Sequence, residues 1–303
     1  MIFVRELCLT VDKKTMFSAD EIIRFIRVLN LKPAKIYAYN LFRNKTIKYE
    51  ESKLYELDTL EKKEGDIHIQ FDLETEEGKC RLYIGDCHND AYRLSAYAPI
   101  QCINDLTDML DELFSNYDEY LFAYIEDENY DEDILLGDDD VDWKKNKFKN
   151  VKLEYIVRLT ENSHIFVVNH KTAKKYQKLH EQCIYEIELY NECLPGHWHN
   201  SDDATFGCAW MMWYGTYYKK YLDFDELRKF DNCSSNVELK NGAIRIKMYD
   251  DIRMYDTKEN VARVWDFRKK LKIDEVAHEI EGLFYPKLEV DENKIIDPGD
   301  KYY

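Results

Sequence analysis

The dipeptide Asn241–Gly242 lies between two runs of mostly alternating apolar and polar residues, and this feature restricts the fold more than any other. An Asn-Gly pair favours a type I′ turn, whose two central residues both need a positive φ and whose twist matches that of two antiparallel strands. The segment NVELKNGAIRIKMY therefore predicts a β-hairpin. Its apolar residues are Val237, Leu239, Ala243, Ile244, Ile246 and Met248.

Other segments alternate helical and strand patterns along the chain. A second hairpin is predicted over residues 66–86, where alternating apolar residues precede Gly78. Ser18 and Glu21 have the spacing of a capping box at the start of a helix that runs to about residue 30. A helix is also predicted over residues 104–116, with an apolar face made by Leu106, Met109, Leu110, Leu113 and Phe114. Two more helices are predicted near the end of the chain. Strands with mostly hairpin connections, interspersed with helices, predict an α+β fold with antiparallel sheets and flanking helices.

A charge block divides the sequence in two. Residues 126–142 contain ten acidic residues in 17 and are followed at once by the basic WKKNKFKN. Such a block is usually a solvated loop or linker. We therefore expect an N-terminal α+β domain over residues 1–125, a linker or loop over 126–150, and a C-terminal α+β domain with an aromatic-rich helix over 151–303. Both halves share a similar order of strands and helices, which suggests a degenerate duplication.

The formal net charge is −17, from 60 acidic and 43 basic residues. A surface this acidic repels nucleic-acid phosphates and anionic membranes, so it disfavours both as direct partners. It would instead attract a basic protein and accelerate their encounter. The alternative interpretation is that the charge serves solubility alone.

The sequence gives no sign of export or of a membrane span. Arg5 and Glu6 interrupt the first apolar run, which excludes an ordinary signal peptide, and no run approaches the roughly 18 apolar residues of a spanning helix. The eight cysteines lie at wide, irregular intervals, as expected of reduced thiols rather than a disulfide framework. The sequence thus predicts a cytoplasmic protein.

The segment from Cys193 to Tyr221, CLPGHWHNSDDATFGCAWMMWYGTYYKKY, is the densest in potential ligands and aromatic rings. Cys193, His197, His199 and Cys208 are of the types that bind zinc, but their spacing matches no recognised zinc motif. Cys208 could instead be a thiol nucleophile beside these histidines, although no nucleophile signature surrounds it.

Packing is the favoured interpretation of this segment. Its large residues recur mostly at three- and four-residue steps, which predicts a helix that is apolar nearly all round and packs as an aromatic spine. Tyr217, Tyr218 and Tyr221 would leave part of their rings at the surface. We accordingly predict no catalytic residue, no metal and no cofactor.

The order of features after Phe206 resembles the immunity-protein group, small acidic bacterial proteins encoded beside polymorphic toxins. The segments concerned are AWMMWYGTYYKKYL, DFDELRKF, VELKNGAIRIKMYDDI and TKENVARVW, so the resemblance covers the C-terminal third. It implies stoichiometric inhibition, in which the protein docks on its toxin and blocks the active site. The group has no shared catalytic residues to transfer.

The resulting hypothesis is that the chain is a non-enzymatic inhibitor of a basic protein. Its acidic residues would attract this partner, and its aromatic residues would be buried in the interface. The predicted contact residues are Asp127, Glu128, Asp131, Glu132, Asp133, Tyr217, Tyr218 and Tyr221. Two alternatives remain. One is a DNA-mimicking antagonist of a nucleic-acid-binding defence enzyme, and the other is a metal-dependent hydrolase centred on His197, His199 and Cys208.

Overall fold

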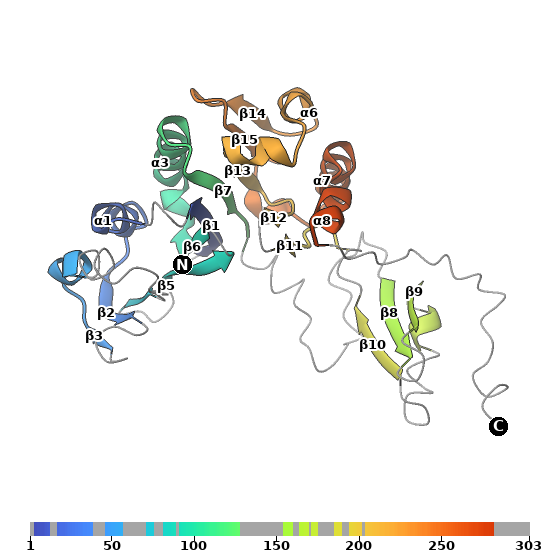
Figure 1. Cartoon of the computed structure of the whole chain (residues 1–303), viewed down its shortest axis with the longest axis horizontal. Helices are drawn as coiled ribbons and strands as arrows, with labels where there is room; N and C mark the ends of the chain where they lie inside the picture. The colour runs from blue at the N-terminus through green and yellow to red at the C-terminus, as the bar shows by residue number, and fades with distance from the viewer. Residues whose placement is uncertain are drawn as a thin grey trace.

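The structure of the chain is a computed structural model, which describes part of its length (Figure 1). The described residues are 3–12, 17–38, 46–56, 71–75, 81–88, 91–127, 154–159, 164–169, 171–174, 185–189, 194–201 and 204–281. Within them the chain combines helices with three antiparallel sheets, which confirms the predicted α+β class.

The largest sheet has ten strands in the order β14-β15-β13-β7-β1-β6-β5-β4-β2-β3. Their bounds are β1 Phe3–Asp12, β2 Pro33–Ala38, β3 Ile47–Lys48, β4 Phe71–Thr75, β5 Arg81–His88, β6 Ala91–Pro99, β7 Tyr120–Ile125, β13 Met211–Tyr214, β14 Ser235–Glu238 and β15 Ile244–Lys247. The pairing of β4 with β5 confirms a hairpin in the 66–86 region.

The hairpin around Gly242 is also confirmed, but its turn type is not. Strands β14 and β15 pair antiparallel, with Glu238 opposite Ile244. The Leu239 amide then donates to the Ala243 carbonyl at 2.8 Å, which leaves a three-residue loop. Of the loop residues only Gly242 has a positive φ, 88°, whereas a type I′ turn needs two. A three-residue loop with a type I turn followed by one left-handed residue, here Gly242, also connects two antiparallel strands with their usual twist.

Two further sheets are smaller. Strands β10 (Tyr185–Leu189), β8 (Glu154–Leu159) and β9 (His164–Asn169) form one of them, in that order. It is drawn at the opposite end of the molecule from β2 and β3 (Figure 1). Strands β11 (His199–Asn200) and β12 (Thr205–Phe206) form a two-stranded ribbon.

Helices α1 (Ala19–Val28) and α3 (Ile103–Asn116) follow the sequence prediction. The Ser18 hydroxyl accepts a hydrogen bond from the Glu21 amide at 3.3 Å, and the Glu21 carboxylate accepts one from the Ser18 amide at 2.8 Å. This is the predicted capping box. All five residues of the predicted apolar face of α3 are buried.

The aromatic segment after Cys208 is not the predicted helix. It forms strand β13, followed by the 3-10 helix η4 (Thr216–Lys220). All four residues of β13 are buried, because the strand lies between β7 and β15 and both faces of the sheet are covered there. A strand buried on both faces reads as a continuous apolar run and so loses the alternation that identifies a strand in sequence. The predicted burial of this aromatic segment is nevertheless confirmed.

The covering layers differ on the two faces of β13. Trp213 points to α3, where its indole N–H donates to Asp111 at 2.8 Å. Tyr214, the next residue, lies on the other face, and its ring centroid is 6.4 Å from that of Phe267 on helix α7 (Lys258–Leu271). Helix α8 (Ile273–Glu281) follows α7. The described residues also include the short helices η2 (Ile100–Cys102), α6 (Phe224–Lys229) and η5 (Ile252–Met254).

The predicted domain boundary falls between two strands that the main sheet brings together. β7 ends at Ile125 and β13 begins at Met211, and Met211 pairs with Ile125 in the sheet. Strands from both predicted domains therefore contribute to one hydrophobic core. Residues 128–150 lie outside the described residues, so the linker itself stays a prediction. Within the described part of the chain, no helix combines the length and apolar character that a membrane crossing requires.

Candidate functional site

Residues 194–200 place two histidines on one side of the chain and a tryptophan on the other. In extended backbone, side chains alternate in direction, so His197 and His199 point together and Trp198 points away from them. The Trp198 ring stacks on Tyr124 of β7, with ring centroids 4.2 Å apart. Trp198 also fills the space where Gly207 has no side chain, since a Cβ there would lie 2.1 Å from the indole. The tryptophan thus fixes the segment on the sheet, and the imidazoles face α7 and α8.

The turn between α7 and α8 supplies the partners of these imidazoles. Lys272, the C-cap of α7, has a left-handed conformation with φ of 53°, and α8 starts at the next residue. Arg268 in the last turn of α7 and Asp274 in the first turn of α8 consequently face each other. Asp274 is placed favourably for a carboxylate, because a helix N-terminus carries partial positive charge.

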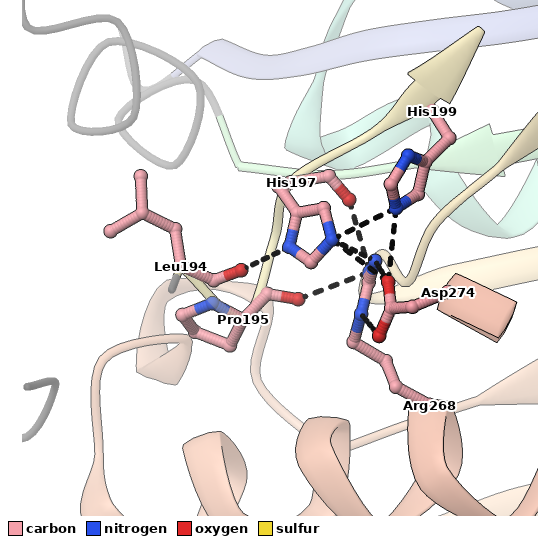
Figure 2. Close-up of polar contacts among 6 residues, drawn as sticks. All are labelled: Leu194, Pro195, His197, His199, Arg268 and Asp274. Carbon is pink, nitrogen blue, oxygen red and sulfur yellow. Dashed lines mark hydrogen bonds and ion pairs between the residues drawn. The ribbon is translucent and has the colours of Figure 1, made fainter. Parts of the chain in front are cut away.

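Four side chains meet at one point, which we name the Arg268 cluster: Arg268, Asp274, His197 and His199 (Figure 2). The Asp274 Oδ1 atom lies 2.9 Å from His197 Nε2 and 3.0 Å from His199 Nε2. The two Nε2 atoms are 3.1 Å apart. The Arg268 side chain is 1% exposed, and both histidines are buried.

The Arg268 guanidinium has an acceptor for each of its five N–H groups. Nε donates to Asp274 Oδ2 at 3.3 Å, and Nη1 donates to the carbonyls of Pro195 at 3.4 Å and His197 at 3.0 Å. Nη2 donates to His197 Nε2 and to Asp274 Oδ1. A guanidinium has five donors and no acceptor, so this set satisfies a buried arginine completely.

These contacts fix the tautomers of both histidines. The Leu194 carbonyl can only accept, so His197 Nδ1, 2.5 Å from it, carries a proton. His197 Nε2 is then the atom that accepts from Arg268. His199 Nε2 carries a proton and donates to Asp274 Oδ1. Arg268 and Asp274 are therefore the charged pair of the cluster, and their charges cancel.

Burial and the adjacent Arg268 guanidinium lower the pKa of His197, and the nearby Asp274 carboxylate offsets this only in part. Burial alone would raise the pKa of Asp274, but the hydrogen bond from His199 and the charge and hydrogen bonds of the Arg268 guanidinium hold it well below its usual range. A neutral His197 and an ionised Asp274 are the states that the hydrogen bonds require.

His197, His199 and Asp274 are also of the types that bind a transition metal, and their ligand atoms lie within 4.8 Å of one another. They do not fit a metal centre. Arg268 Nη2 already contacts His197 Nε2 and Asp274 Oδ1, the atoms that would bind the ion. An ion there would strip two buried N–H groups of their acceptors and face a second positive charge, which is costly at low dielectric. The cluster uses Arg268 as its cation.

The structure brings together only part of the predicted zinc set. His197 and His199 converge, as that hypothesis required, but Cys208 is not in the group and Asp274 takes its place. Burial raises the pKa of the Cys208 thiol far above its usual range, and the side chain is fully buried, so it is no nucleophile. Cys193 lies outside the described residues.

The predicted partner-binding residues have mixed outcomes. Glu128, Asp131, Glu132 and Asp133 lie outside the described residues, whereas Asp127 is 5% exposed. Tyr218 is 2% exposed, and its hydroxyl donates to the Thr205 carbonyl at 2.8 Å and accepts from the Thr205 amide at 3.1 Å. Asp127 and Tyr218 are therefore wrong as exposed contacts.

The remaining two predicted anchors, Tyr217 and Tyr221, are half-buried. The Lys220 ammonium lies over both rings, 3.7 Å from the Tyr217 centroid and 4.5 Å from that of Tyr221. The ring surface that would receive a basic partner therefore carries a cation of its own, which makes both tyrosines weaker anchors for such a partner than the sequence suggests.

Sequence reasoning missed Arg268 and Asp274. Both lie in segments that read as ordinary amphipathic helices, FRKKLKIDEVAHEI, in which charged residues are expected on the solvent side. The one available signal was the position of Arg268 beside Phe267 and three residues before Leu271, both on the apolar face.

The fold and the cluster together define an acidic α+β protein in which, among the described residues, four polar side chains form a buried group whose charges cancel. No family model matches the chain, and no curated protein matches it. Among solved structures, the chain is similar to the Pseudomonas aeruginosa T6SS protein PA0821, with a TM-score of 0.49 and 10% sequence identity over 89% of this chain and 72% of that one.

Proposed function

We propose that this protein is a non-enzymatic, cytoplasmic immunity-type inhibitor that binds a basic protein toxin and blocks its active site. The observation that carries the proposal is the net charge of −17, which favours a cationic macromolecular partner. The resemblance of the C-terminal third to the immunity-protein group supports the same function.

The chemistry of the buried cluster supports a binding role over catalysis. A general base needs an accessible lone pair near its substrate. The His197 Nε2 lone pair accepts from Arg268 instead, and the Cys208 thiol is neutral and buried. The groups that sequence reasoning offered to a hydrolase are thus committed to internal contacts.

Part of the charge lies on the outer side of α3. Asp105, Asp108 and Glu112 are exposed at steps of three and four residues, opposite the buried face of the helix. Glu112 pairs with Arg24 of α1. A row of three carboxylates is too short to favour the DNA-mimic alternative, because DNA presents a continuous series of phosphates.

The test combines the purified chain with the product of the neighbouring reading frame, which the proposal requires to be a basic toxin. We expect a stoichiometric complex that abolishes the toxic activity, and an association rate constant that falls as salt rises. Complex formation is followed by calorimetry and association by stopped flow. Absence of a complex at micromolar concentrations contradicts the proposal.

A matched pair of variants separates a specific acidic surface from net charge. One variant carries Asp131→Lys, Glu132→Lys and Asp133→Lys, and the control carries the same three-site reversal at Asp105, Asp108 and Glu119, which are exposed in the structure. Both change the net charge equally. We expect the first variant to slow association at low salt roughly tenfold more than the control does. Equal slowing would contradict a contact role for the 131–133 segment.

A further inference from the structure

The Arg268 cluster joins three separately placed parts of the fold. Arg268 belongs to α7, Asp274 to α8, and His197 and His199 to the segment that Trp198 fixes on the main sheet. Beneath the cluster, Ile273 and Ala277 of α8 are fully buried. The polar contacts of the cluster therefore hold α8 against residues 194–200, next to the buried apolar side chains of α8.

A second proton on His197 would disturb both the contacts and the charge balance of the cluster. His197 Nε2 accepts from Arg268 Nη2, and a proton on Nε2 would turn this contact into one between two donors. The new N–H could donate to Asp274 Oδ1 at 2.9 Å, but that oxygen already accepts from His199 and Arg268. The cluster would then hold an imidazolium and a guanidinium in contact, with one carboxylate to balance them.

Each described element packed around His197 contributes a charged or titratable group. β11 contributes His199, α7 contributes Arg268, and α8 contributes Asp274. The ring of His278, also on α8, packs against His199 with centroids 5.2 Å apart. Glu126, at the end of β7, interacts electrostatically with Cys208, as Arg268 and Asp274 do. Protonation of His197 would therefore place a second positive charge beside a buried arginine.

We propose that the Arg268 cluster is an acid-sensitive latch that holds α8 on the 194–200 segment near neutral pH and releases it when His197 is protonated. The inference does not depend on the identity of the partner. In the released state the guanidinium and the imidazolium both reach water, which removes the cost of two buried cations.

The direction of the pH effect follows from proton binding. The folded state lowers the pKa of His197 below its ordinary value of 6.5, so the released state binds more protons than the latched state. The stability of the latch is therefore complete above about pH 6.5 and declines as the pH falls below it. If His197 stays neutral in the latched state, the equilibrium constant for release rises roughly twentyfold between pH 7 and pH 5.

Hydrogen exchange followed by mass spectrometry tests the latch in the intact protein. After correction for the intrinsic pH dependence of exchange, we expect opening of residues 194–200 and 273–281 to increase roughly twentyfold from pH 7 to pH 5. Helix α3, residues 103–116, lies on the other face of the sheet and serves as the internal control. An equal increase in α3, or no change in α8, overturns the proposal.

A variant of His197 assigns the effect to this residue. In His197→Gln the amide oxygen can still accept from Arg268, but the side chain does not titrate, so the pH dependence of exchange in α8 should nearly disappear. His278→Gln, which removes an imidazole outside the Arg268 contact, should keep most of it. Retention of the full pH response by His197→Gln overturns the proposal. If that variant does not fold, the comparison of α8 with α3 in the unmodified protein still decides.

Discussion

Arg268 and Asp274 form a bidentate ion pair across the turn from α7 to α8, in which Arg268 Nε donates to Asp274 Oδ2 and Nη2 donates to Oδ1. The two residues are only six positions apart in the sequence, yet the guanidinium also donates to the carbonyls of Pro195 and His197, more than 70 positions away. One side chain thereby ties the end of the chain's described part to the segment that packs on the main sheet.

Removal of the carboxylate from this pair should be strongly destabilising. In Asp274→Asn the buried guanidinium keeps its charge and loses its counter-ion, and breaking a buried pair from one side costs about 3 kcal/mol. Denaturant unfolding followed by tryptophan fluorescence measures the loss. The control, Asp225→Asn, removes an exposed partner of Arg228 and should cost less than about 0.5 kcal/mol. Similar losses in the two variants would contradict the buried role of Asp274.

Metal addition distinguishes the guanidinium-centred cluster from a metal centre. We expect the protein, after treatment with a chelator, to bind no zinc at equimolar concentration and to show no rise in Tm, because Arg268 occupies the position of the cation. Elemental analysis after desalting and a thermal melt provide the two measurements. Near-stoichiometric zinc with a raised Tm would show that the guanidinium yields its place to an ion, and would return the hydrolase alternative to consideration.

The parts of the fold that sequence predicted correctly are those set by local rules. Ser18 and Glu21 determine a helix start within one turn, and the alternation around Gly242 determines a strand pair. β13 could not be predicted in this way. Trp213 and Tyr214 are buried by α3 and α7 on opposite faces, so the period of two disappears, and the same residues fit a helical spacing equally well.

The candidate site depends on tertiary geometry for a different reason. His197 and His199 could be predicted as a pair because one residue separates them and extended backbone points both the same way. Asp274 lies 75 residues beyond His199, and the turn at the left-handed Lys272 between α7 and α8 places it opposite Arg268 and beside the imidazoles. A cysteine nearer in sequence was the natural guess for the third ligand, and the fold buries it elsewhere.

A methyl group at Gly207 should disturb the Arg268 cluster indirectly, by displacing Trp198, although Gly207 is not in contact with the cluster. The Cβ of Gly207→Ala would lie 2.1 Å from the Trp198 indole, so the ring must leave its stack on Tyr124 and move the histidines on either side of it. We expect a loss of about 2–3 kcal/mol, as for other overpacked cores. Gly242→Ala is the control. Its φ of 88° is unfavourable for a residue with a Cβ and should cost about 1 kcal/mol, but the nearest atom would be 3.4 Å from the new methyl group, so no steric clash adds to this cost. A neutral Gly207→Ala would contradict the placement of Trp198.

Tyr218 separates the two roles considered for the tyrosine segment. Its hydroxyl both donates to and accepts from the backbone of Thr205, so Tyr218→Phe leaves a buried carbonyl and a buried amide without this partner. We expect unfolding free energy to fall by about 1–3 kcal/mol, with no change in partner affinity for the fraction that remains folded. Tyr117→Phe, on a ring that is 51% exposed, should change stability by less than about 0.5 kcal/mol. Chemical denaturation gives the stability, and calorimetry with the folded variant gives the affinity. A Tyr218→Phe protein of normal stability but weakened binding would restore this tyrosine as an interface anchor, against its burial in the fold.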